Sequence, residues 1–310
     1  MSSIEQSIKR KIESVGTPLK DWDINIYRGV LTGCNEAFII STEKRDEILA
    51  NCETEEERAR TSELIRPILR GRDIKRYGYE WANLYLIATF PACRYDIDNY
   101  PAVKDYLVSF AEQNLRESGN NWVADLYLED YCKQKLAQTG KFIEIKGKRI
   151  YIGNTAEKAR KKTSNKWFET QDSISYWEDF YKPKIMYPNM TKFMPFYYDE
   201  KQFFQNDKSF MITGEHTAFL TAFLNSSIFK FCFIDNFPEL LGGTRELRKI
   251  FFDKIPVLQV SDEVNNTFIP IIESIQMEYT YEKAKEVDSM IFDLYNLTLE
   301  ERQVIGFVEF

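Results

Sequence analysis

The sequence has very little of the chemistry that most enzymes use. It contains a single histidine, His216, which we expect to be a capping or surface residue in front of a helix rather than a catalyst. Its five cysteines are scattered, odd in number and never spaced as C-x-x-C. This argues against a disulfide framework or a zinc site, and favours a reducing compartment. Phosphate-binding glycine loops, the G-x-S-x-G elbow and the H-E-x-x-H motif are also absent.

No segment of the sequence predicts secretion or membrane insertion. Residues 1–20 are polar and lack the apolar core of a signal peptide. The longest apolar run, Ala218–Ile234, is interrupted by polar residues and is too short to span a bilayer. Because this run is apolar almost all round, it predicts one buried core helix. We therefore expect a cytoplasmic protein that has no membrane partner.

The order of hydrophobic patterns predicts an α+β fold. With 310 residues, 44% of them hydrophobic, the chain can form one large domain or two smaller ones. Helices are predicted after the capping box at Thr54 and from Pro101, and residues 142–152 predict a β-hairpin. Short strands are predicted at 183–187, 193–198 and 209–213, and helices after Pro256. The absence of a regular βαβ alternation indicates mixed, mostly antiparallel twisted sheets with surrounding helices and a helical C-terminal segment.

Positive charge is concentrated in one segment of an acidic chain. The net charge is −7, but residues 141–166 contain nine cations and two carboxylates, so this segment carries +7 and the rest −14. A local basic face on an acidic body is compatible with nucleic-acid binding, although a solvated loop would show the same pattern. The predicted hairpin is narrow enough for the DNA major groove, with lysines at its tip to meet phosphates and Arg149 to reach a guanine edge.

Two further stretches contain candidate contacts. Residues 27–40 predict a strand, a turn at 32–35 and a second strand, and Asn35 could pair with adenine or be an ordinary turn residue. Residues 63–77 set a glycine turn among cations that could form a second basic edge or pair with the acidic helix upstream. The cations in question are Arg70, Arg72, Lys75 and Arg76.

One pattern suggests catalysis instead. Glu144 and Lys146 lie on a predicted strand, with Asp125 and Asp130 upstream. This is similar to the acidic and E-x-K arrangement of Mg²⁺-dependent nucleases, in which carboxylates hold the metal. Because so short a pattern is common by chance, an ordinary charged hairpin is the simpler interpretation.

Several blocks of the sequence, in the same order, resemble a known family. After residues 27–40 and the stretch IRPILRGRDIKRY come YPA at 100–102, WFE at 167–169 and PKIMYP at 183–188. FMIT at 210–213, FLNS at 223–226, LGG at 241–243 and FDLYNLT at 292–298 follow. Together they resemble the TaqI-like C-terminal specificity domain of adenine-specific DNA methyltransferases, including combined restriction–modification (Type IIG) enzymes, over residues 22 to 303.

The resemblance implies a module that grips duplex DNA and selects a short target sequence. In the family, a separate upstream domain carries an Asn/Asp-Pro-Pro-Tyr/Phe motif and methylates a flipped adenine. That motif is absent here, so we expect no catalytic residue in this chain. S-adenosylmethionine and Mg²⁺ are expected only in catalytic domains that the chain lacks, and an upstream methyltransferase domain or subunit is the expected partner.

These observations together predict an organisation and a set of DNA contacts. Residues 1–22 would be a linker, 23–260 the recognition domain and 261–310 a helical closing segment. Loops at 32–35 and 242–245 and the hairpin would read bases, while cations hold phosphates. The predicted DNA-binding residues are Thr32, Asn35, Arg70, Arg72, Lys75, Arg76, Lys146, Lys148, Arg149, Arg160, Lys161, Lys162, Lys184, Lys192 and Arg245. A protein-interaction module is the remaining alternative, because the overall charge is acidic.

Overall fold

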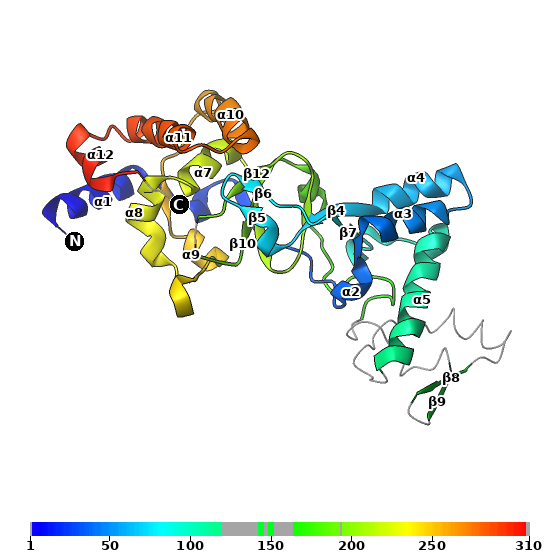
Figure 1. Ribbon diagram of the computed structural model, residues 1–310. Helices are drawn as coiled ribbons and strands as arrows, with labels where there is room; N and C mark the ends of the chain where they lie inside the picture. Colours follow the sequence, from blue (N-terminus) through cyan, green and yellow to red (C-terminus); the bar gives the residue numbers. More distant parts are fainter. Residues whose placement is uncertain (1, 119–141, 146–147, 152–163, 193, 308–310) are drawn as a thin grey trace. The chain divides into compact units, whose positions relative to one another are not determined.

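The chain folds into two compact units, each built from separate stretches of sequence. The computed structural model describes residues 2–118, 142–145, 148–151, 164–192 and 194–307 (Figure 1). Unit 1 comprises Met1–Gly29, Leu69–Ala82 and Glu178–Phe310, and unit 2 comprises Val30–Ile68 and Asn83–Trp177. This division differs from the predicted boundaries at 22 and 260. The reason is that Ile8 near the N-terminus and Ile291 near the C-terminus belong to the same hydrophobic core.

Unit 1 is organised around a four-stranded antiparallel sheet in the order β12-β10-β14-β2. Its strands are β2 (Ile24–Arg28), β10 (Lys184–Pro188), β12 (Tyr197–Asp199) and β14 (Ser209–Gly214). Three smaller antiparallel pairs are β1 (Thr17–Pro18) with β16 (Pro256–Val257), β5 (Ile74–Lys75) with β6 (Gly78–Tyr79), and β11 (Met190–Thr191) with β15 (Arg245–Glu246). The unit also contains β13 (Phe204–Gln205). The predicted strands at 183–187 and 209–213 are confirmed as β10 and β14.

Helices from both ends of the chain pack in unit 1. They are α1 (Ser3–Val15), α7 (Thr217–Leu224), α8 (Ser227–Phe233), α9 (Lys249–Phe252), α10 (Asp262–Met277), α11 (Tyr281–Leu294) and α12 (Leu299–Ile305). Figure 1 shows α1 and α12 near each other, and Lys11 of α1 forms an ion pair of 2.8 Å with Glu301 of α12. Ile8 and Ile12 are fully buried, so the first residues form part of the core rather than a separate linker.

The apolar run at 218–234 forms two helices, α7 and α8, not the single predicted helix. Asn225 ends α7, and its side-chain amide pairs with the backbone N–H and C=O of Phe196 at 3.2 and 2.8 Å. Ser226 then caps α8 by accepting a hydrogen bond from the Phe229 N–H. The two polar residues satisfy buried backbone groups of the sheet and of the new helix, so the chain turns without leaving the core.

Unit 2 is smaller and places helices beside a short sheet. Strand β7 (Leu84–Ile87) pairs antiparallel with both β3 (Ile39–Ser41) and β4 (Ile65–Leu69). The helices are α2 (Asn35–Phe38), α3 (Thr42–Ala50), α4 (Glu55–Leu64) and α5 (Pro101–Ser118). The hairpin predicted at 142–152 is confirmed as the antiparallel pair β8 (Phe142–Ile145) and β9 (Lys148–Tyr151).

Capping and buried polar groups define the helices of unit 2. The Thr54 hydroxyl accepts a hydrogen bond from the Glu57 N–H at 3.1 Å, which confirms the predicted start of α4. The buried Glu57 carboxylate in turn accepts hydrogen bonds from the backbone N–H groups of Glu53 and Ala102. A single side chain therefore links the beginnings of α4 and α5.

The fold class predicted from the sequence, α+β with mostly antiparallel sheets, is confirmed. The stretch 27–40 departs from its predicted form, because α2 is inserted before the second strand and the two strands belong to different units. Among the described residues, no single helix is long and apolar enough to cross a membrane. The bent helix pair Thr217–Leu224 and Ser227–Asn236 is together long and apolar enough, judged by length and composition alone. Both α7 and α8 contribute to the core of unit 1.

Candidate nucleic-acid interface

The basic segment at 141–166 belongs to unit 2, and the structure describes it in part. Lys148 and Arg149 lie in β9 of the hairpin, where Arg149 is opposite Glu144 in the antiparallel register. Lys166 is exposed, and its ammonium lies 5.7 Å from the centre of the Phe168 ring. Four predicted contacts, Lys146, Arg160, Lys161 and Lys162, lie outside the described residues, as do Asp125 and Asp130 of the nuclease-like pattern.

The turn at 32–35 orients one of its two predicted base contacts and buries the other. Thr32 is fully buried, and its hydroxyl donates to Asn35 Oδ1 at 2.7 Å and accepts from the Cys34 N–H at 3.2 Å. The predicted DNA contact by Thr32 does not fit this burial. Asn35 is exposed at the beginning of α2, where the Thr32 hydroxyl fixes the orientation of its amide.

The cations at 70–76 separate into two structural and two exposed residues. Arg70 forms a bidentate pair with the buried Asp73, at 2.9 and 2.8 Å, and thereby closes the turn. Arg76 donates to the Tyr279 hydroxyl and to the Asn225 carbonyl oxygen, so its guanidinium is used in packing. These contacts compete with the predicted phosphate contacts of Arg70 and Arg76.

The other two cations of this turn remain accessible. Lys75 is exposed and forms a solvent-accessible pair of 3.5 Å with Glu80, which is a weak interaction that a phosphate can replace. Arg72 is exposed, and within the described residues it has no ion pair. The carboxylates that pair with Arg70 and Lys75 are Asp73 and Glu80, and neither belongs to the acidic helix upstream.

The predicted DNA contact by Lys184 does not fit the structure. Its side chain is fully buried, and its ammonium lies 2.5 Å from Asp199 Oδ2 and 2.7 Å from the Phe180 carbonyl oxygen. Asp199 also accepts hydrogen bonds from the N–H groups of Lys201 and Phe203. A buried pair with these extra hydrogen bonds holds the end of β10 in place, and its ammonium cannot reach a phosphate on the surface.

Lys192 and Arg245 are brought together by the strand pair β11–β15. Both line a small cavity of about 30 Å³ together with Thr191 and Leu247. Arg245 donates to the carbonyl oxygens of Ile234 and Phe237 and pairs with Asp235 and Glu239, which makes it an anchor of its loop. Lys192 is exposed and has no ion pair within the part of the chain that the structure describes.

A cavity joins this strand pair to the turn at 70–76. It has a volume of about 310 Å³, and Arg72, Lys75, Met190 and Thr191 are among its lining residues. We refer to Arg72, Lys75 and Lys192 as the unit 1 edge, since Lys192 follows Thr191 directly. Sequence reasoning missed a neighbouring cation, Lys208, which is exposed and pairs with Asp207. No sequence signal marks it, because it is brought close only by the fold: a Cβ at Gly71 would lie 2.4 Å from the Lys208 carbonyl oxygen.

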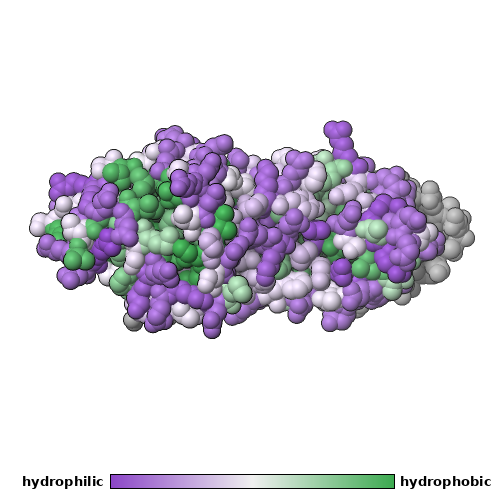
Figure 2. Space-filling view, turned by 90° about the horizontal axis from the view of Figure 1, so that it is seen from above, coloured by the Kyte–Doolittle hydropathy of each residue, from purple (hydrophilic) through white to green (hydrophobic). Residues whose placement is uncertain are grey.

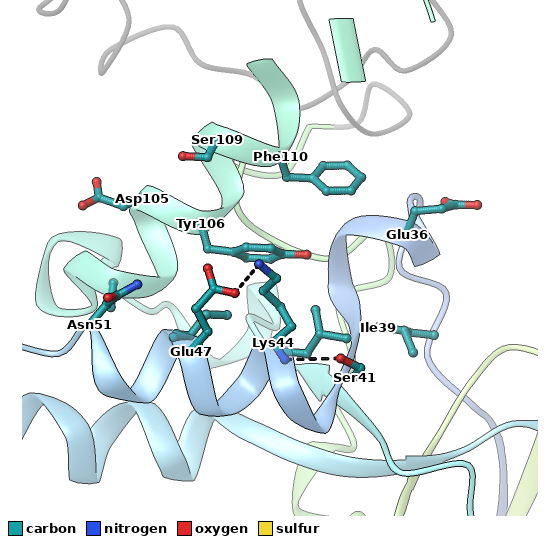
Figure 3. A pocket seen from close by; sticks show the side chains of 13 residues that line it. Glu36, Ile39, Ser41, Lys44, Glu47, Asn51, Asp105, Tyr106, Ser109 and Phe110 are labelled. Carbon is teal, nitrogen blue, oxygen red and sulfur yellow. Dashed lines mark hydrogen bonds and ion pairs between the residues drawn. The ribbon is translucent and has the colours of Figure 1, made fainter. Parts of the chain in front are cut away.

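A hollow in unit 2 has the opposite electrostatic character. It has a volume of about 500 Å³ between α2, β3, α3 and α5 (Figure 3). Three carboxylates line it, those of Glu36, Glu47 and Asp105, and the only lysine, Lys44, is paired with Glu47 at 2.5 Å. This negative lining disfavours contact with a phosphate backbone.

The face shown in Figure 2 is mostly hydrophilic, and hydrophobic residues gather where Figure 1 places α11 and α12. Within the described residues, no group of three His, Cys, Asp or Glu side chains could hold a metal ion. His216 stands at the N-cap position of α7 in the left-handed conformation. Its side chain makes no capping hydrogen bond, and its Nε2 lies 2.9 Å from Asp262 Oδ1. Thus the features that could bind a ligand are cationic edges and exposed loops.

Comparison with known proteins gives this arrangement a context. The family model of the TaqI-like C-terminal specificity domain matches residues 139–257, which include part of unit 2 and the strands β10, β12 and β14 of unit 1. No curated protein matches the sequence significantly. The matched region contains the basic segment, Lys192 and Arg245.

Two solved structures share the fold across almost the whole chain. The Type IIG restriction endonuclease BpuSI aligns with a TM-score of 0.50 at 12% identity, over 95% of this chain and 34% of its own. The Type IIL restriction-modification enzyme MmeI, solved in complex with DNA, aligns with a TM-score of 0.51 at 9% identity, over 92% of this chain and 34% of its own. The chain therefore spans about a third of the length of each enzyme. Residues 139–257 are therefore similar to a TaqI-like C-terminal specificity domain, and the chain shares its fold with parts of two restriction-modification enzymes.

Proposed function

We propose that this chain is a DNA target-recognition module, which selects a short sequence in duplex DNA and has no catalytic activity of its own. The match of residues 139–257 to a specificity domain is the observation that carries the proposal. The shared fold supports it, because one of the two similar enzymes, MmeI, was solved bound to DNA.

The charge distribution supports a nucleic-acid partner despite the net charge of −7. Residues 141–166 carry +7, and Arg72 and Lys192 of the unit 1 edge have no ion pair within the described residues. Cations that are not already paired inside the protein can release counterions from the phosphate backbone, which is the main source of affinity for DNA. The carboxylate-lined cavity of Figure 3 lies on a part of unit 2 that the phosphates would avoid.

Phosphate contacts and base contacts fall to different groups in this proposal. Lys148, Lys161 and their neighbours would hold the backbone together with the unit 1 edge. The exposed Asn35 amide, held by Thr32, has the donor and acceptor needed to pair with adenine in the major groove. Loss of a phosphate contact would weaken binding to all sequences, whereas loss of Asn35 would change which sequence is preferred.

The module would act with partners that supply the chemistry. A methyltransferase domain or subunit would bind S-adenosylmethionine and transfer the methyl group, and Mg²⁺ would belong to a nuclease part. Cytoplasmic DNA is the expected substrate, in keeping with the free thiols of Cys34, Cys52, Cys93 and Cys232.

A binding experiment with the full chain tests the proposal. A mixed-sequence duplex is titrated at several salt concentrations, and a randomised duplex pool is then enriched by repeated binding. We expect a log–log salt slope of roughly −5, as about six phosphate contacts would produce, and enrichment of one short sequence. Affinity for duplex DNA that is insensitive to salt would favour a protein-interaction module, and DNA cleavage by the purified chain would contradict a non-catalytic role.

The matched control for this experiment is an exposed lysine outside the predicted set of DNA contacts. Lys148→Ala, Arg149→Ala and Lys161→Ala together remove three predicted DNA contacts, whereas Lys230→Ala removes an exposed lysine of α8 outside the predicted set. The triple variant should lose both affinity and salt slope, and the control should retain both. Equal binding by the two variants would contradict the assignment of the basic segment.

A further inference from the structure

The loop between α8 and β15 presents an apolar side chain to solvent at its tip. The side chain of Leu241 is 99% exposed, and Leu240 beside it is 41% exposed. The next two residues, Gly242 and Gly243, have φ of 76° and 78°, a conformation that other residues rarely adopt. In Figure 1 the yellow chain that follows α8 reaches away from the helices of unit 1.

The base of this loop is held firmly although its tip is exposed. The backbone of Glu239 bridges that of Arg245, and Leu240 donates its N–H to the Thr244 carbonyl oxygen at 2.6 Å. Buried residues flank the loop on both sides, Phe237 with 1% exposure and Leu247 with 2%. Because the arms are anchored in the core, the tip is presented in a preorganised position, at little further entropic cost on binding.

The tip stands beside the cations of the unit 1 edge. A Cβ at Gly242 would have the Lys192 ammonium as its nearest neighbour, at 3.9 Å. Lys192 in turn follows Thr191, which lines the same cavity as Arg72. A duplex whose phosphates meet Lys192 would therefore bring its bases close to Leu241.

We propose that Leu241 is a wedge that inserts between neighbouring bases of the bound duplex. Leucine is one of the side chains that DNA-bending proteins insert between base steps, where it unstacks them and bends the helix. The cation beside the tip favours DNA over a protein partner as the occupant. This inference rests on the proposed DNA recognition, and it adds a distortion of the duplex that phosphate and base-edge contacts do not require.

Insertion can be measured separately from binding. The probes are the duplexes that the wild-type chain enriches from the random pool, with 2-aminopurine replacing each adenine in turn. This base is quenched when stacked, so its fluorescence rises where a wedge opens the stack. We expect a rise at one step with the wild-type chain and with Leu241→Met, and none with Leu241→Ala, whose affinity should fall about tenfold.

Leu299→Ala is the matched control, because Leu299 is also highly exposed, at 79%, on α12. It should behave as the wild type in both fluorescence and affinity. A duplex that binds without any rise, or a rise that persists in Leu241→Ala, overturns the wedge and leaves DNA recognition intact. Failure of the wild-type chain to enrich any duplex overturns both. Normal DNA behaviour of Leu241→Ala combined with loss of binding to another protein would assign the tip to a protein contact.

Discussion

The two units use the same residue types in different ways. In unit 1 many cations are internal: Lys184 is buried against Asp199, Arg76 packs against Tyr279, and Arg245 ties a loop to neighbouring carbonyls. In unit 2 the densest run of lysine and arginine lies in and around a β-hairpin, with only two carboxylates among nine cations. The comparison teaches that the number of cations says little about an interface until their internal partners are known.

Two of the cavities also differ in the charge of the residues that line them. The hollow of unit 2 in Figure 3 is lined by three carboxylates, whereas the 310 Å³ cavity of unit 1 is lined by Arg72 and Lys75. The specificity-domain match includes residues of both units.

The largest expected effect comes from removing a buried cation of unit 1. Lys184→Met leaves the Asp199 carboxylate buried without its partner, so the free energy of unfolding should fall by about 3–5 kcal/mol. Lys182→Met is the control, because its ion pair with Asp179 involves a lysine side chain that is 59% exposed, and such pairs contribute about 1 kcal/mol or less. Urea unfolding measures both variants. Equal stability of the two variants would show that Lys184 is not a structural residue.

The next effect compares the DNA contacts of the two units. Lys148→Ala, Arg149→Ala and Lys161→Ala together should reduce the magnitude of the salt slope by about 3, and Arg72→Ala with Lys192→Ala by about 2. At moderate salt the triple variant should lose affinity on the order of a hundredfold. Duplex titrations of each variant at several salt concentrations measure these slopes. A change confined to one set would assign all phosphate contacts to a single unit.

Thiol reactivity compares the interiors of the two units. Burial raises the pKa of Cys34 in unit 2 to about 11 and that of Cys232 in unit 1 to about 12. Because the thiolate is the reactive form, Cys34 should be alkylated on the order of a hundredfold, and Cys232 on the order of a thousandfold, more slowly than an unburied thiol at pH 8, with rates that rise as the pH increases. Mass spectrometry of labelled peptides measures this, with the partly exposed Cys93 as internal reference. Rapid labelling of Cys232 at pH 8 would contradict a closed core.

The smallest effect separates the stabilities of the units. Thr54→Ala removes the N-cap of α4 in unit 2, and Thr280→Ala removes that of α11 in unit 1, each at a cost of about 1 kcal/mol. Hydrogen exchange should show faster exchange in the unit that carries the change and little in the other. Thr54→Ser and Thr280→Ser retain the capping hydroxyl and should exchange as the wild type does. Equal acceleration in both units would indicate that they unfold together.

The sequence was sufficient for elements whose signals are local. The cap at Thr54, the helix that begins at Pro101 and the hairpin of β8 and β9 all form where the pattern predicts them. Each depends on residues within a few positions of one another, so the chemistry can be read along the chain. The mixture of strand and helix signals likewise predicted the α+β class. The order of the sequence blocks indicated a specificity domain over residues 22 to 303, of which the family model matches 139–257.

Only the tertiary structure decided how distant residues are used. The apolar run at 218–234 breaks into two helices because the Asn225 amide binds the backbone of Phe196, 29 positions away in sequence. Lys184 is internal because Asp199 and the sheet enclose it, and Thr32 turns inward to hold Asn35. Composition and spacing determined which groups this protein possesses. Burial and long-range pairing, which depend on contacts between remote segments, determined which of them are left to meet a ligand.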